Sequence, residues 1–121
     1  FQDPAYGIRM LVDIALQALS PAVNAPTTAY QVILRLSYLL TMVAQRPPFT
    51  GIFADDDNQI CLIVPAPSWE ELIDLAFTEI IYYGKEDPQT RLSLLTTFEY
   101  LIGKVPAVYQ PPLMEKRACI E

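Results

Sequence analysis

The sequence contains no histidine, only two cysteines and only four glycines. Without histidine the commonest general base of enzymes is missing, and a hydrolytic triad of the usual form is excluded. Cys61 and Cys119 lie far apart, so neither a zinc knuckle nor a CxxC redox pair is present. They are either two free thiols in a reducing compartment or one disulfide. The isolated glycines exclude a glycine-rich phosphate loop.

Basic residues and long hydrophobic runs are scarce as well. Eight Lys and Arg stand against 14 Asp and Glu, which gives a formal net charge of −6. Nucleic-acid-binding proteins cluster Lys and Arg, so we expect no nucleic-acid partner. Charged residues, an asparagine and prolines interrupt the longest apolar candidate before it reaches the length of a membrane-spanning helix. These interruptions are Arg9, Asp13, Pro21, Asn24 and Pro26.

What the chain has in excess is hydrophobic residues, which make up 52% of its 121 positions with a mean hydropathy of +0.24. This length is typical of a single soluble domain, residues 1–121, that folds without a metal or a disulfide. So apolar a composition predicts hydrophobic surface left outside the core and a partner that covers it, either another copy or a part of the protein outside this sequence. A homo-oligomer is the default expectation. Because the chain lacks an initiator Met and stops soon after a helix start, we also expect an excised fragment of a larger protein.

Start and stop signals around helical hydrophobic periodicities predict five helices. Two starts combine an aspartate cap with a proline in the first turn, at Asp3 and Asp87. A third start is the capping box of Ser68 and Glu71, and Gly84 predicts a left-handed stop for that helix. The predicted helices are Pro4 to about Leu19, a start between Pro26 and Thr28 with an end before Pro47, Ser68 to Gly84, Pro88 to Gly103, and a start near Pro112.

The segment between Thr50 and Val64 has a different residue pattern, with apolar and β-branched runs on either side of an Asp- and Asn-rich turn. This pattern is typical of a β-hairpin. Since two strands alone are marginally stable, we expect the hairpin to lean on the helices or to pair with another chain. The predicted fold class is mainly α: a helical bundle of about five helices with one small β-hairpin inserted between helices two and three.

A polar line on the first helix is the strongest candidate site. Arg9 and Asp13 lie four residues apart and therefore share one helix face, which Gln17 and Ser20 extend through apolar surroundings. We expect this line to be buried, where charges must be paired. One interpretation is an ion pair with a helix cap and no ligand. The other is a ligand site made of Arg9, Asp13, Asn24, Thr27 and Thr28.

Other polar groups have simpler explanations, so we predict no catalytic residue, no metal site and no cofactor. The run Asp55 to Asn58 opens like a calcium loop, but the loop's required Gly and Glu would be Ile60 and Ala66. Carboxylates at the start of the third helix are explained by the helix dipole, because Glu70 and Glu71 lie in its first turn. Trp69, Tyr82 and Tyr83 are interpreted as packing residues rather than as a stacking platform.

Several segments carry a family resemblance: Asp3-Pro-Ala-Tyr-Gly-Ile-Arg, Leu11-Val-Asp-Ile-Ala, Ala18-Leu-Ser-Pro, Asn24-x-Pro-Thr-Thr-Ala29 and Ser68-Trp-Glu-Glu-Leu. They resemble bacterial predicted membrane proteins catalogued as domain of unknown function twenty-two fifty-four. The resemblance implies transmembrane helices before this segment, a place in the cell membrane and no established activity. The chain departs from the family pattern at Ala22, usually Gly, and at Ala25, usually Asp. Losing that Asp costs a cap worth about 1 kcal/mol unless Asn24 replaces it.

The sequence and the resemblance together favour a non-enzymatic extramembrane domain, on the cytoplasmic side, that assembles or regulates the membrane part. The alternative is a domain that senses a small ligand or ion through the buried polar cluster. An enzyme is the third option, and it would need a second carboxylate beside Asp13 in an open pocket.

Overall fold

The computed structural model describes residues 4–45, 52–54, 60–63 and 67–120. These residues contain five α-helices, which confirms the predicted number of about five. A 3₁₀ turn, η1 (Ala107–Tyr109), precedes the last of them. The helices are α1 (Pro4–Leu19), α2 (Pro26–Gln45), α3 (Trp69–Gly84), α4 (Pro88–Lys104) and α5 (Gln110–Ala118).

Two of the predicted helix starts are confirmed in atomic detail. The Ser68 hydroxyl accepts a hydrogen bond from the Glu71 amide at 3.2 Å, at the start of α3. The Asp87 carboxylate caps α4, because its Oδ2 accepts from the Thr90 amide at 2.9 Å and from the Thr90 hydroxyl at 2.8 Å. The left-handed stop predicted at Gly84 is wrong, since α3 continues through that residue and its φ is not positive.

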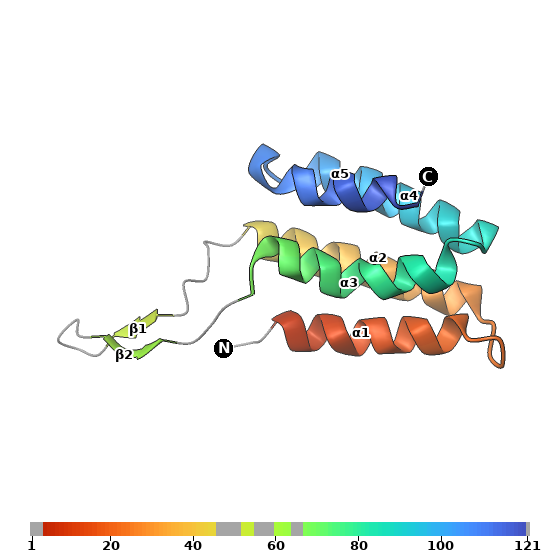
Figure 1. The fold of residues 1–121 in the computed structure, drawn as a ribbon, viewed down its shortest axis with the longest axis horizontal. Helices are drawn as coiled ribbons and strands as arrows, with labels where there is room; N and C mark the ends of the chain where they lie inside the picture. Colours follow the sequence, from red (N-terminus) through yellow and green to blue (C-terminus); the bar gives the residue numbers. More distant parts are fainter. Residues whose placement is uncertain (1–3, 46–51, 55–59, 64–66, 121) are drawn as a thin grey trace.

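The helices form a closed ring around one core. α1 packs on α2 and on α3, and α4 packs on α2 and more lightly on α3. α5 lies against both α3 and α4, so it covers the bundle on the side away from α1 (Figure 1). The start of α3 is tied to η1, because the Trp69 indole donates to the Tyr109 carbonyl at 2.8 Å and its ring packs on the Tyr109 ring.

The centre of the bundle is aliphatic and aromatic. Phe77 of α3 and Phe98 of α4 are completely buried, and their ring centroids lie 4.6 Å apart. Around this pair each of the first four helices contributes residues spaced three or four apart, as the hydrophobic periodicity predicts. The other completely buried large side chains are Ile8, Val12, Ile33, Leu36, Leu40, Ile73, Ile80, Leu94, Leu101 and Leu113.

The prediction that a β-hairpin forms part of the packed domain is wrong, and the fold class is corrected to an all-helical bundle. Between α2 and α3 the structure describes two short stretches, β1 (Ile52–Ala54) and β2 (Ile60–Ile63), which pair antiparallel with an irregular register. They lie apart from the helices (Figure 1). Strands of three and four residues are too short to bury a sheet face, whereas the helices close the core by themselves. The predicted turn, Asp55 to Asn58, lies outside the described residues.

Candidate functional site

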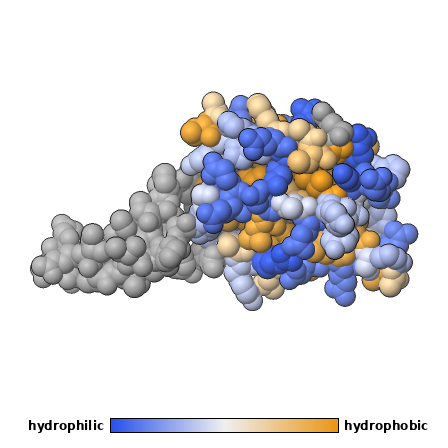
Figure 2. Space-filling model, in the orientation of Figure 1, coloured by the Kyte–Doolittle hydropathy of each residue, from blue (hydrophilic) through white to orange (hydrophobic). Residues whose placement is uncertain are grey.

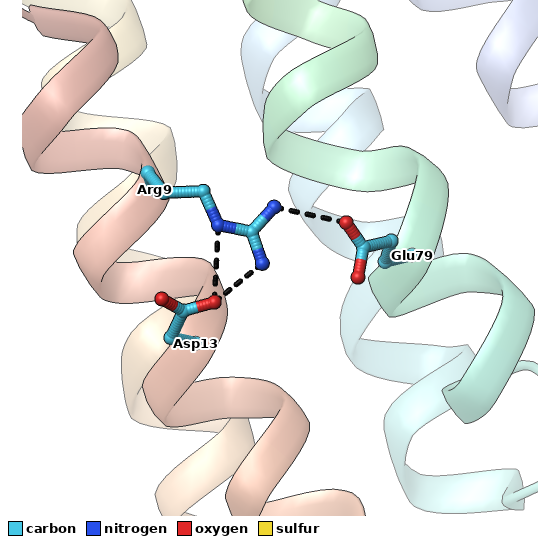
Figure 3. A network of polar contacts seen from close by, with 3 residues as sticks. All are labelled: Arg9, Asp13 and Glu79. Atoms are coloured by element: carbon cyan, nitrogen blue, oxygen red, sulfur yellow. Dashed lines mark hydrogen bonds and ion pairs between the residues drawn. The ribbon is translucent and has the colours of Figure 1, made fainter.

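The first two residues of the polar line of α1, Arg9 and Asp13, belong to a three-residue network between α1 and α3 (Figure 3). The Arg9 guanidinium donates to Asp13 Oδ1 from Nε at 3.0 Å and also from Nη2. Its Nη1 donates to Glu79 Oε1 of α3 at 2.9 Å. Arg9 therefore connects two helices through one carboxylate from each.

The electrostatics of this network are those of a partly solvated cluster. Hydrogen bonds from Arg9 to Asp13 and then to Glu79 raise the pKa of the guanidinium above its usual range, so Arg9 stays charged at physiological pH. One cation and two carboxylates leave one net negative charge. The side chains are 38% exposed for Arg9, 61% for Asp13 and 46% for Glu79. Ion pairs so exposed contribute about 0–1 kcal/mol each.

The expectation that the polar line is buried is therefore wrong for Asp13 and only half right for Arg9. The reason is geometric, because a step of four residues turns about 40° more than a full helix turn. A line that begins beside α3 at Arg9 consequently moves outwards and reaches the exposed surface at Gln17. The sequence alone shows that these residues share a face, but it does not show which neighbour that face meets.

The structure does not bring the five predicted site residues together. Asn24 lies in the loop after α1 with a φ of 45°, and its amide donates to the Ser20 carbonyl at 2.8 Å. It is exposed, as are Thr27 and Thr28 in the first turn of α2. Among the described residues no hydrogen bond or ion pair joins these three to Arg9 or Asp13. Ligand binding by the set stays a prediction.

Sequence reasoning missed Glu79, which also lines a small open cleft between the end of α1 and α3. Glu79 follows Arg9 by 70 positions, and no local signal pairs such distant residues. The cleft has a volume of about 290 Å³, at the lower limit of ligand sites. Its lining is Leu16, Leu19, Ser20, Pro21, Glu79 and Tyr83. In the part of the chain that the structure describes, no cluster of three potential metal ligands occurs.

A second feature of α1 is a row of exposed hydrophobic side chains. Tyr6, Met10 and Ile14 lie four residues apart and are 67%, 50% and 46% exposed. Apolar residues beyond this row are also exposed, and on the face in view they are interspersed with hydrophilic ones (Figure 2). Six of the seven tyrosines and all three methionines are at least 39% exposed. Tyr and Met are enriched at the centres of protein interfaces, so the exposed apolar residues are of the interface kind.

Comparison with known proteins gives one family and three relatives. The family described as "Predicted membrane protein (DUF2254)" matches residues 1–100. Two uncharacterised proteins of Mycobacterium tuberculosis strains and one of Mycobacterium bovis are 36% identical to the chain over 94 residues. That match covers 78% of this chain but 18% of each relative, so the chain spans less than a fifth of their length. No solved structure matches the chain significantly.

Within residues 4–45 and 67–120, none of the helices combines the length and the apolar composition needed to cross a bilayer.

Proposed function

We propose, for a chain that belongs to the DUF2254 family of predicted membrane proteins, that the helical bundle is a non-enzymatic extramembrane module through which copies of the protein assemble. The observation that carries the proposal is the exposed row of Tyr6, Met10 and Ile14 on α1. A helix face with this spacing is complementary to another helix, because side chains four apart form the ridges of helix packing.

The occupant of this row is a second copy of α1. Two copies of α1 in antiparallel contact around Met10 would place Tyr6 beside the partner's Ile14, so one apolar row covers the other. The same arrangement reverses the order of Arg9 and Asp13 along the edge of the contact. A parallel pair would set each charge beside its own copy, whereas the antiparallel pair moves the two Asp13 side chains apart and brings each towards the partner's Arg9, which favours this pairing over a parallel one.

The test is the molar mass of the chain in solution by sedimentation velocity over a range of micromolar concentrations. Met10→Glu and Ile14→Glu are each expected to raise the dissociation constant of the dimer by about tenfold or more, because each places a charge in the apolar contact. The matched control is Gln17→Glu, which adds the same charge at an exposed position of the same helix. A chain that stays monomeric throughout, or a Gln17→Glu variant that dissociates equally, would contradict the proposal.

We also propose that the module lies on the cytoplasmic side. Its support is Cys119, an exposed and free thiol, which is the state that a reducing compartment maintains. In intact cells a membrane-impermeant maleimide is expected to leave Cys119 unlabelled, and labelling is expected to appear after lysis. Labelling of Cys119 in intact cells would place the module outside.

A further inference from the structure

The outer face of α2 carries no acidic residue, although the chain has 14 of them. Between Asp13 and Asp55 the sequence contains no other Asp or Glu, and Arg35 is the one charged residue within α2. The remaining exposed positions of α2 are polar but uncharged, or are large and apolar. They are Thr27, Thr28, Tyr30, Gln31, Tyr38, Met42 and Gln45.

α4 extends this surface with an aromatic ring and a lysine. Tyr38 of α2 meets Tyr100 of α4 edge to face, with ring centroids 6.3 Å apart. The Lys104 ammonium lies 5.7 Å from the centroid of the Tyr100 ring. The acid of α4 is directed elsewhere, because Glu99 pairs with Arg117 of α5 at 3.2 Å. We call the surface made of Tyr30, Tyr38, Met42, Tyr100 and Lys104 the tyrosine face.

The residues of the tyrosine face are accessible. Tyr30, Tyr38, Met42 and Tyr100 are 44%, 50%, 52% and 39% exposed. The acids of the bundle gather on a different helix, since α3 carries Glu70, Glu71, Asp74 and Glu79. The negative charges of the bundle are therefore unevenly distributed, because α3 is rich in carboxylates and α2 has none.

We propose that the tyrosine face rests on the headgroup layer of the membrane. Tyrosine is enriched at membrane–water interfaces, where its ring lies among the headgroups and its hydroxyl stays hydrated. A lysine beside the rings extends its apolar stem over them and directs its ammonium to lipid phosphates. The absence of carboxylates avoids repulsion from anionic lipids, and the acids on α3 favour the orientation in which α3 faces away from the membrane.

Charge also decides between lipid and a second copy as the occupant. Pairing two tyrosine faces would add the charges of Lys104 and of the neighbouring exposed Arg35 from both copies, with no carboxylate on either face to neutralise them. Anionic headgroups supply the missing negative charge. The inference therefore goes beyond self-association, since it assigns α2 and α4 to the bilayer and leaves the α1 row to the partner copy.

The experiment is co-sedimentation of the chain with vesicles of phosphatidylcholine, alone or mixed with phosphatidylglycerol. We expect more binding to the mixed vesicles. The double variant Tyr38→Glu with Met42→Glu is expected to bind at least about tenfold more weakly, because two carboxylates then meet an anionic surface. The matched control is Tyr82→Glu, on α3 and 71% exposed, which is expected to bind like the unchanged chain.

The inference would be overturned by no binding of the unchanged chain to mixed vesicles, or by an equal loss of binding in Tyr82→Glu. Circular dichroism of each variant shows that the helices are intact. Met10→Glu separates this inference from self-association, because it changes the α1 row and leaves the tyrosine face as it is. Retained vesicle binding by Met10→Glu together with a lost dimer supports both assignments, and loss of vesicle binding in that variant would place lipid on α1 instead.

Discussion

Phe77→Ala is expected to lower the free energy of unfolding by about 3–5 kcal/mol, the usual cost of removing a buried aromatic ring. The ring of Phe77 is completely buried and packs on Phe98 of α4 at 4.6 Å. α3 and α4 make few other contacts with each other, so the contact between Phe77 and Phe98 is the main link between these two helices. The loss combines the transfer of the ring to water with the cavity left between α3 and α4.

Urea unfolding followed by far-UV circular dichroism measures the change. Because a domain of this size is stable by about 5–15 kcal/mol, Phe77→Ala lies near the limit of folding, and Phe77→Leu provides a milder variant with a smaller expected loss. Tyr82→Ala is the control, since it removes an exposed ring from the same helix and is expected to cost less than about 1 kcal/mol. Equal losses in Phe77→Ala and Tyr82→Ala would show that the core does not centre on the phenylalanine pair.

The helix boundaries were predictable because their signals are local. Asp87 and Pro88 act within the first turn of α4, and Ser68 acts on an amide three residues away. Such caps work through the chain's own neighbouring amides, so they need no knowledge of the tertiary structure. The start of α1 at Pro4 and its end at Leu19 follow from the same kind of signal.

The candidate site was less predictable, since it depends on contacts between helices. The four-residue spacing correctly indicates that Arg9 and Asp13 pair, but the partner on α3, Glu79, is set by how α1 packs in three dimensions. The burial of the line was wrong for the same reason. Hydrophobic neighbours in the sequence do not imply burial, because the hydrophobic side chains of Met10 and Ile14 are themselves exposed beside the charged pair.

The hairpin prediction failed at a different level. A run of apolar and β-branched residues indicates an extended chain locally, and the paired strands β1 and β2 occupy part of the predicted segment. Whether a strand becomes part of the packed domain depends instead on how much apolar surface it buries there. The helices bury their own apolar faces in a closed ring, which leaves the domain all helical.

Gly84 and Thr90 provide the second large effect, and it tests why the end of α3 needs a glycine. A Cβ atom at Gly84 would lie 2.6 Å from Thr90 Cγ2 and 3.3 Å from Leu19 Cδ1. Thr90 is buried, and its hydroxyl donates to the Asp87 cap at 2.8 Å, so the methyl group cannot turn away without breaking that hydrogen bond. Glycine is therefore required by close packing between α1, α3 and α4 and not by a left-handed turn.

Gly84→Ala is accordingly expected to lower the free energy of unfolding by about 1–3 kcal/mol, the usual cost of overpacking, even though alanine favours a helix over glycine. Thr90→Ser removes the clashing methyl group and keeps the hydroxyl on Asp87. In that background Gly84→Ala is expected to be neutral or stabilising by up to about 1 kcal/mol. Urea unfolding of the four proteins gives the coupling energy. A coupling energy of zero would mean that the Thr90 methyl does not set the requirement for glycine.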